Sequence, residues 1–171
     1  NILGITKAYT TRVGSGPFAT DLNDEIGDHF VEKGQEFGTV TKRRRRCGWF
    51  DSVLVKQSIA INGITNIVLT KLDVLDDLKE IKVCIGYDDG NKKYNYLPFD
   101  EKLQKNLFPI YETLPGWQSS TYGLTSWNDL PKNAQNYINF LEKTIEKSIS
   151  IISTGPNRIH TIDRNNLLSN S

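Results

Sequence analysis

The stretch Ile64-Thr65-Asn66-Ile67-Val68-Leu69-Thr70-Lys71-Leu72-Asp73 decides the fold class. Its first seven residues form a short apolar run, which predicts a strand buried inside a sheet. The polar residues that follow it then lie at the carboxyl end of that strand, where open α/β sheets bind ligands. A helix is expected just before the strand, over residues 51–62, and Gly63 closes it.

A second helix and strand of the same kind lie near the end of the chain. Residues 131–147 predict an amphipathic helix, with Pro131 at its start. Residues 148–153 predict a second buried strand, which ends at Thr154-Gly155-Pro156. The apolar positions at helical spacing are Ala134, Tyr137, Ile138, Leu141 and Ile145.

The remaining segments add strands, a helix and a hairpin. Residues 2–11 predict a strand, and a helix is expected from Thr20 or Asp21 to about Gly34. Residues 80–87 and 93–97 alternate around a turn-forming Asp-Asp-Gly-Asn sequence, which predicts a β-hairpin. Residues 109–114 are a further strand candidate. We therefore expect residues 1–171 to form one α/β unit, a piece of a mixed sheet with a hairpin insertion.

Composition narrows the classes of function. The 171 residues include 21 basic and 20 acidic side chains, a net charge of +1, which provides no global attraction to nucleic acid or membranes. Cys47 and Cys84 lack the spacing of a disulfide framework or a metal site, so we expect reduced thiols in a cytoplasmic protein. No apolar run is long enough for a membrane span. The chain has no methionine, so we expect a processed or truncated product.

Residues 70–73 suit recognition of guanine. An ionised Asp73 presents a fork of acceptor oxygens, and guanine N1–H and the 2-amino group form the matching pair of donors, which adenine lacks. The aliphatic stem of Lys71 can lie on the face of the base. The pattern is similar to the Asn-Lys-x-Asp element of GTPases, although so short a motif also fits a loop with a solvated lysine and aspartate.

Ser153-Thr154-Gly155 follows the other apolar strand. A turn there could offer backbone N–H groups to the guanine 6-oxygen, and Pro156 adds a flat apolar surface. An ordinary strand-ending turn is the alternative. Two such elements, each after a buried strand, indicate a nucleotide site more strongly than either does alone.

The loop at residues 38–48 carries the run Lys42-Arg43-Arg44-Arg45-Arg46. Consecutive cations repel one another unless anions gather them, and arginine forks suit carboxylates and phosphates. The functional interpretation is a loop that binds an anionic substrate and is mobile without it. A solvated loop or a nucleic-acid patch is the alternative.

Several expected parts of a complete site are missing. No GxxxxGK[ST] phosphate loop occurs, so a guanine-reading element would lack its phosphate cradle. His29 and His160 are isolated, and neither forms a convincing catalytic pair. Val13, before a glycine turn, could offer backbone groups to a ligand.

The chain resembles the C-terminal portion of the adenylosuccinate synthetase family, and the resemblance is collinear over nearly its whole length. It implies that family's P-loop-hydrolase-like α/β fold. The segments that carry it are KAYTTRVGSGPF (7–18), QEFG (35–38), the run of Arg43 to Arg46, CGWFD (47–51), LTKLDVL (69–75), YETLPGW (111–117) and IISTGP (151–156).

The resemblance implies a ligase that uses GTP to join L-aspartate to IMP, giving adenylosuccinate. Arg43 and Arg45 are then the catalytic arginines, near IMP and the GTP phosphates respectively, and Val13 lies beside the IMP ribose. The implied aspartate and IMP contacts are Val13, Thr39, Val40, Thr41, Lys42, Arg43, Arg44 and Arg45. The implied GTP contacts are Arg45, Lys71, Leu72, Asp73, Ser153, Thr154 and Gly155.

Two positions depart from the family pattern. Lys42 stands where glycine is frequent, and Val40, which has no hydroxyl, stands where threonine is frequent. The phosphate loop, the general base and acid, and most of the Mg²⁺ site belong to the family's N-terminal half, so we expect this chain alone to be inactive and to hold no metal. A homodimer is expected for the full-length protein. The competing interpretations are a nucleic-acid-binding module that uses Arg43 to Arg46 and a free-standing guanine-nucleotide-binding protein.

Overall fold

The computed structural model describes residues 2–168, and these form two compact units. The first unit contains residues 2–8, 55–81 and 114–168 of the described chain, and the second contains residues 9–54 and 82–113. The sequence led us to expect one unit. Its elements are nevertheless those of a mixed α/β protein, with parallel and antiparallel strand pairs.

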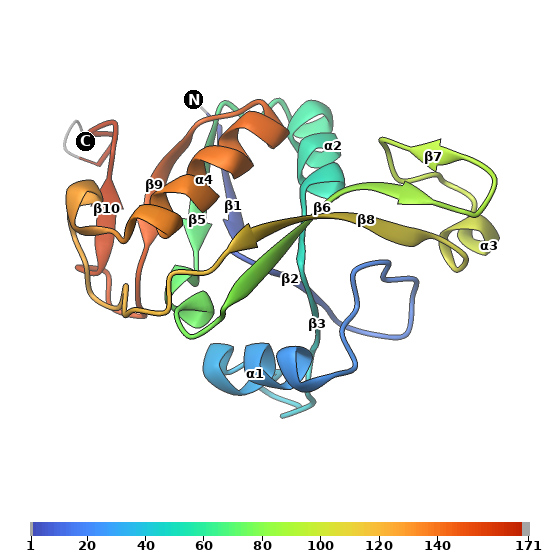
Figure 1. Ribbon diagram of the computed structural model, residues 1–171, viewed down its shortest axis with the longest axis horizontal. Helices are drawn as coiled ribbons and strands as arrows, with labels where there is room; N and C mark the ends of the chain where they lie inside the picture. The colour runs from blue at the N-terminus through green and yellow to red at the C-terminus, as the bar shows by residue number, and fades with distance from the viewer. Residues whose placement is uncertain (1, 169–171) are drawn as a thin grey trace. The chain divides into compact units, whose positions relative to one another are not determined.

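The first unit is built on a four-stranded sheet with the order β1-β5-β9-β10 (Figure 1). β1, β5 and β9 are parallel neighbours, and β10 pairs antiparallel with β9. Both strands predicted from the apolar runs are present as β5 and β9, but β9 is buried nearly throughout whereas β5 buries only Ile67 and Leu69. β10 was not predicted. The bounds are β1 Leu3–Lys7, β5 Asn66–Thr70, β9 Ile149–Ser153 and β10 Thr161–Asp163.

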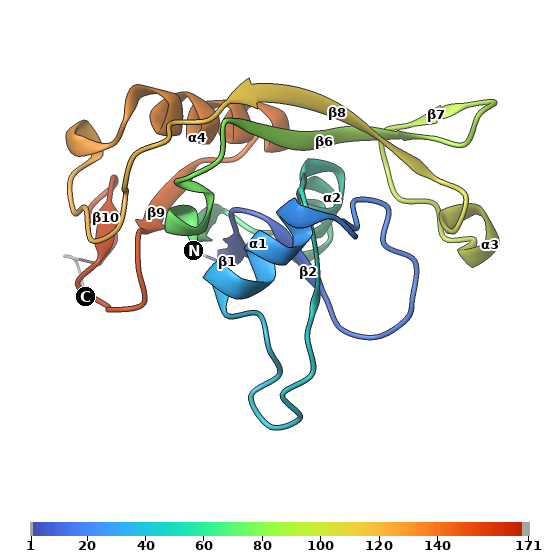
Figure 2. The ribbon, with the colours of Figure 1, turned by 60° about the horizontal axis from the view of Figure 1, so that its bottom comes forward.

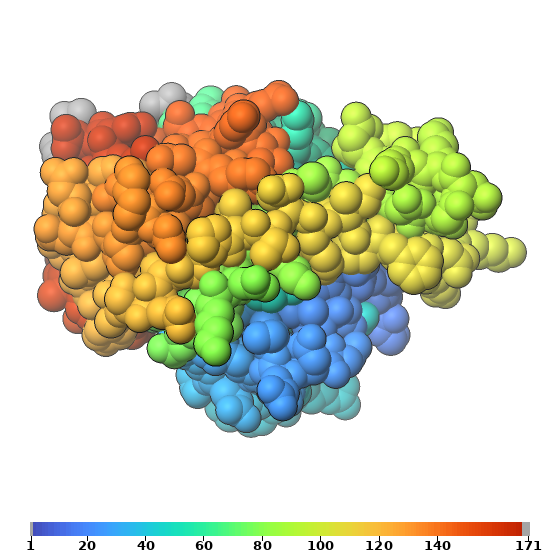
Figure 3. Space-filling view, viewed as in Figure 1, coloured from blue at the N-terminus to red at the C-terminus, as the bar shows by residue number. Residues whose placement is uncertain are grey.

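Helix α4 (Lys132–Ile145) packs on this sheet through its apolar face (Figure 2). The five apolar residues predicted from helical spacing are the buried residues of α4. The loop before α4 and the helix itself form one continuous surface in Figure 3. Tyr137, fully buried in α4, donates a hydrogen bond of 2.7 Å to the backbone oxygen of Ala8, just beyond β1. Two 3-10 helices, η1 (Leu72–Leu75) and η2 (Trp127–Asp129), complete the unit.

Replacing Tyr137 with phenylalanine should destabilise the protein by about 1–3 kcal/mol, because the buried carbonyl of Ala8 loses its donor. Tyr122→Phe is the matched control: Tyr122 is exposed, and its loss of a hydroxyl should change stability by less than about 0.5 kcal/mol. Urea unfolding of the full-length protein measures both. Equal effects of the two substitutions would contradict the anchoring role of Tyr137.

The second unit contains a short antiparallel pair and a sheet with the predicted hairpin. β2 pairs with β3, while β6 pairs with β4, β7 and β8. The hairpin of β6 and β7 is confirmed, although β7 is shorter than expected. The bounds are β2 Thr10–Arg12, α1 Glu25–Gly34, β3 Arg46–Gly48, β4 Phe50–Asp51, β6 Glu80–Asp88, β7 Lys93–Tyr94, α3 Glu101–Gln104 and β8 Phe108–Pro115. α2 (Ser52–Asn62), β6 and β8 carry residues of both units.

Two sequence predictions in this region were wrong. The strand expected over residues 2–11 is interrupted at Ala8 and Tyr9, which separate β1 from β2 in the sequence. Both residues are buried. α1 begins after Asp24, whose carboxylate accepts hydrogen bonds from the backbone N–H groups of Ile26 and Gly27. Asp21, one of the residues predicted as the cap, instead binds an arginine of the basic run.

Asp51 ties the hairpin sheet to the start of α2. One carboxylate oxygen accepts from the Leu54 backbone N–H at 3.1 Å, and the other accepts from the Tyr87 hydroxyl at 2.6 Å. Burial raises the pKa of Asp51, as desolvation penalises its charged form more than these hydrogen bonds favour it. Burial also raises the pKa of the nearby Cys84 thiol to about 12, so this cysteine is not a reactive thiolate at neutral pH.

Candidate functional site

The carboxyl ends of β5 and β9 meet at one edge of the first unit's sheet. In the parallel register, Val68 faces Ile151 and Leu69 faces Ile152. β5 ends at Thr70 and β9 ends at Ser153, so the two polar segments that follow them lie side by side. The structure thus brings together the segments 70–73 and 153–155, which lie about eighty residues apart in the sequence.

The turn after β5 fixes the direction of Lys71 and Asp73. Lys71 has a φ of 64°, a left-handed conformation that is costly for a residue other than glycine. Leu72 follows and is fully buried as a whole residue, so the contact to GTP predicted for it is not open at this surface. Lys71 and Asp73 are both partly exposed on either side of it. Such strain is commonly retained at binding sites, where it places side chains that a relaxed turn would not.

A buried carboxylate holds the η1 helix that carries Asp73. Asp76 accepts hydrogen bonds from Trp117 Nε1 at 2.8 Å, from the Thr121 backbone N–H at 2.8 Å and from the Thr121 hydroxyl at 2.7 Å. These contacts fasten η1 to the loop before η2. Asp76 was not predicted from the sequence, because its partners lie more than forty residues away.

Thr154 and Gly155 shape the turn after β9. Thr154 is buried, its hydroxyl donates to the Leu124 carbonyl at 2.8 Å, and its backbone N–H donates to the His160 carbonyl at 3.0 Å. The Thr154 N–H therefore already has an acceptor within the protein and is not open to the guanine 6-oxygen. A Cβ at Gly155 would lie 2.6 Å from Nδ1 of His160, so any larger residue there would require the His160 ring to move. Ser153 is partly exposed, and its hydroxyl donates to the Gly155 carbonyl at 3.0 Å.

Asp76→Ala should destabilise the protein by about 3 kcal/mol or more, because three buried donors lose their acceptor. The exposed Asp129→Ala is the control and should stay within about 0.5 kcal/mol of the parent. Urea unfolding distinguishes them. A loss of stability no larger than that of the control would show that Asp76 does not hold η1.

The arginine loop lies in the second unit, between α1 and β3, and extends away from α1 (Figure 2). Hydrogen bonds between Gly38 and its neighbours close its tip: the Gly38 N–H donates to the Arg43 carbonyl at 2.8 Å, and the Lys42 N–H donates to the Gly38 carbonyl at 2.9 Å. Lys42 has a φ of 52°. This left-handed conformation explains on physical grounds why glycine suits that position.

The tip presents few side chains that could hold a ligand by themselves. Val40 is 91% exposed and has no hydroxyl, so only its backbone could bind a polar group. The Thr41 hydroxyl accepts a 3.4 Å hydrogen bond from the Arg43 N–H, and Thr39 is exposed. Their hydroxyls and the Arg43 side chain remain the groups at this tip best suited to an anion.

Three of the four arginines are paired with carboxylates of the protein itself. Arg44 forms an ion pair with Asp28 on α1, in which both side chains are half exposed. Arg45 pairs with the buried Glu36 at 2.8 Å. The pairing within the protein removes much of the repulsion that led us to expect a mobile loop, although the mobility itself stays a prediction.

Arg46 binds Asp21 at 2.6 Å and also donates to the carbonyls of Gly14 and Gly16, at 3.2 and 2.7 Å. It therefore fastens the glycine turn beside the 79%-exposed Val13.

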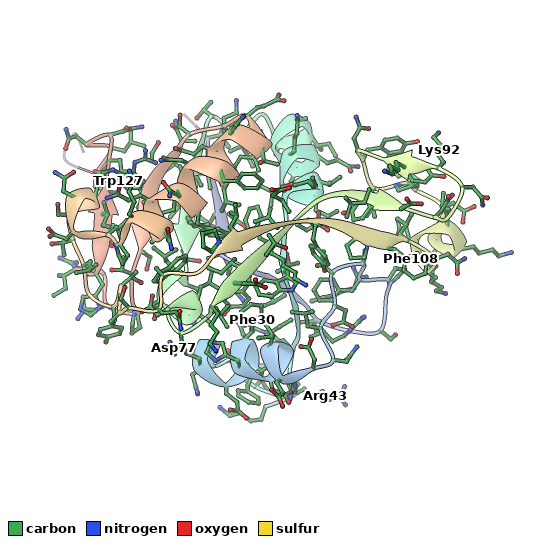
Figure 4. The ribbon with its side chains drawn as sticks, in the orientation of Figure 1. Phe30, Arg43, Asp77, Lys92, Phe108 and Trp127 are labelled. Carbon is green, nitrogen blue, oxygen red and sulfur yellow. The ribbon has the colours of Figure 1, made fainter. Side chains whose placement is uncertain are left out.

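Arg43 differs from its neighbours. Within residues 2–168, neither Arg43 nor Lys42 forms an ion pair. Figure 4 labels Arg43 beside the end of α1, and the residue is exposed. The surface that a nucleic acid would meet thus has far less unpaired positive charge than the five-residue run implies, which weighs against a nucleic-acid patch.

Other groups do not form a second chemical centre in the part of the chain that the structure describes. Residues 2–168 contain no group of three or more His, Cys, Asp or Glu side chains that could hold a metal ion. His29 packs beside Phe30, and His160 lies edge-on to Tyr122 with ring centroids 5.0 Å apart. No described helix combines the length and the apolar character needed to cross a membrane.

Comparison with known proteins gives one consistent result. The family model of adenylosuccinate synthetase matches residues 1–162. The chain is 54% identical over 165 residues to the adenylosuccinate synthetase of Ehrlichia chaffeensis and 53% identical over 166 residues to that of Ehrlichia canis, covering 96% and 97% of this chain. The fully ligated adenylosuccinate synthetase structure from Plasmodium falciparum superposes with a TM-score of 0.91 at 40% identity, over 95% of this chain.

The matched proteins are considerably longer than this chain. It spans 38% of the length of each Ehrlichia relative and 40% of the Plasmodium falciparum chain.

Proposed function

The chain belongs to the adenylosuccinate synthetase family, and from that premise we propose that it supplies guanine recognition and a substrate-binding arginine loop to a ligase of purine biosynthesis. In the proposed reaction, GTP phosphorylates the 6-oxygen of IMP, and the amino group of L-aspartate then displaces that phosphate. The products are adenylosuccinate, GDP and phosphate.

The observation that carries the nucleotide part of the proposal is the adjacency of the ends of β5 and β9. Asp73 accepts from guanine N1–H and the 2-amino group, and the stem of Lys71 covers the base. Ser153 and Gly155 complete the contact surface, and the fully buried Leu72 supports the turn from within. Thr154 contributes by holding the turn, because its hydroxyl and N–H already have partners in the protein.

The arginine loop binds the anionic substrates in this proposal. Arg43, which has no ion pair among the described residues, binds aspartate and approaches IMP. Arg45 stabilises the charge that spreads over the transferring phosphoryl group. The remaining contacts to aspartate and IMP come from Val13, Thr39, the Val40 backbone, Thr41, Lys42 and Arg44.

The rest of the enzyme is expected from the family. We propose that the phosphate loop, the general base and acid, and the Mg²⁺ site lie in the N-terminal part of a full-length protein, so that this chain alone is inactive. The residues described here contain no cluster suited to a metal, and none of the roles above depends on one. A homodimer in the cytoplasm, with Cys47 and Cys84 as reduced thiols outside any disulfide, completes the proposal.

Asp73→Asn in the full-length enzyme should shift nucleotide preference from GTP toward XTP. Asparagine replaces one acceptor with a donor, and this donor matches the 2-oxo group of xanthine. We expect kcat/KM for GTP to fall about 10²-fold or more, since a buried mismatch of a hydrogen-bonding pair costs several kcal/mol, and the value for XTP to rise. Steady-state assays with both nucleotides provide the measurement.

Asp77→Asn is the matched control, since it makes the same chemical change four residues further along the same segment. Asp77 is exposed and lies at the rim of the unit in Figure 4. Its substitution should leave the preference for GTP intact. An Asp73→Asn enzyme with unchanged use of GTP and XTP would exclude Asp73 as the base reader.

A further inference from the structure

We infer that Glu36 is a positioning residue that holds Arg45 in its working orientation, with Tyr9 as the partner that fixes Glu36. The inference rests on the proposed function in one respect: it takes Arg45 as the arginine that acts on the transferring phosphoryl group. Glu36 itself contacts no substrate in this account.

The three side chains form a continuous chain of hydrogen bonds inside the second unit. The Tyr9 hydroxyl donates to Oε1 of Glu36 at 2.6 Å, and Nη1 of Arg45 donates to Oε2 at 2.8 Å. The backbones are joined as well, because the Arg45 N–H donates to the Glu36 carbonyl at 2.9 Å. Each carboxylate oxygen therefore has its own partner, and Arg45 is held at both its main chain and its guanidinium.

The carboxylate end of this chain is buried and closely packed. Glu36 is 1% exposed and Tyr9 is 2% exposed, and the Tyr9 ring stacks on Phe30 with centroids 4.9 Å apart. Phe30 in turn meets Trp49 edge-on at 5.3 Å. A Cβ at Gly34 would lie 2.2 Å from the Tyr9 hydroxyl, so the last residue of α1 must be glycine for the hydroxyl to reach Glu36.

The other end of the chain opens to solvent. The Arg45 side chain keeps 32% of its surface exposed, while its carboxylate partner keeps 1%. Only Nη1 is committed to Glu36, and a guanidinium has further N–H donors in a fixed plane. Glu36 thus restrains the guanidinium through Nη1 and leaves the outer donors for an anion. Orientation fixed in advance lowers the cost of binding a transition state.

The neighbouring arginines show that this arrangement is particular to Arg45. Arg44 pairs with Asp28, but that carboxylate is 56% exposed, so solvent screens the pair. Arg46 donates hydrogen bonds to Asp21 and to the carbonyls of the glycine turn, so its guanidinium stabilises the protein's own structure. Of the paired arginines in the run, Arg45 alone combines a buried anchor with a partly exposed guanidinium.

A double-mutant cycle in the full-length enzyme tests the inference. Glu36→Gln is nearly isosteric and can keep neutral hydrogen bonds to Tyr9 and Arg45, but it removes the charge that orients the guanidinium. We expect kcat to fall about 10²-fold, the usual order for misplacement of a reacting group. In an Arg45→Ala background, the same substitution should cause no further loss, because coupled residues are not additive.

The alternatives give different patterns. An equal loss from Glu36→Gln in both backgrounds, or no loss in either, would overturn the positioning role while leaving the proposed function standing. An Arg45→Ala enzyme with parent activity would instead remove Arg45 from the proposed chemistry. The Arg45→Ala variant by itself would reveal this outcome, so failure of the proposed function can be told apart from failure of the positioning role.

Two further variants keep the test interpretable. Asp28→Asn removes the exposed carboxylate partner of Arg44 and should change kcat by less than about twofold. Tyr9→Phe removes one hydrogen bond to Glu36 and should lower kcat less than Glu36→Gln does, again only when Arg45 is present. If thermal unfolding shows that Glu36→Gln fails to fold, the cycle between Tyr9→Phe and Arg45→Ala takes its place, and additivity there would overturn the inference.

Discussion

The parallel pairing of β5 with β9 is the constraint on which the candidate nucleotide site depends. β9 is buried except at Ser153, and β5 buries Ile67 and Leu69, so the hydrophobic effect brings the two strands together whatever follows them in the chain. Because they are parallel and in close register, their polar continuations must emerge at the same edge. Asp76 and Thr154 then fix the two emerging turns from within. In the proposed function, recognition of a base at this edge follows from the sheet geometry together with a few buried hydrogen bonds.

In the second unit, the constraint is the electrostatic repulsion among four consecutive arginines, Arg43 to Arg46. Carboxylates from α1 and its flanks pair with three of them. The three carboxylates differ in how deeply they are buried, and each ion pair therefore restrains its arginine to a different degree. A screened pair on the surface stabilises little, a pair with a buried carboxylate fixes an orientation, and an arginine without an ion pair stays available to a ligand. A single run of like charges can therefore contain residues with separate roles.

Much of the architecture could be predicted from local patterns. The strands β5 and β9, the helices α2 and α4 and the β6–β7 hairpin follow from periodicity and turn residues, because each is set by its own sequence. The start of α1 could not be predicted in the same way, since Asp21 is drawn to Arg46 by a contact across twenty-five residues. The roles of Glu36 and Asp76 were missed for the same reason. A buried carboxylate has no local signature, and its partners become visible only once the chain is folded.

The central claim is that Asp73, at the end of β5, reads the guanine base beside the turn after β9. A crystal structure of the full-length protein with bound GDP tests it most directly. The account predicts both carboxylate oxygens of Asp73 within hydrogen-bonding distance, about 2.7–3.2 Å, of guanine N1 and of the 2-amino group, with the Lys71 stem against the base. A guanine bound elsewhere, or one held at this edge with Asp73 turned away from N1, would contradict it.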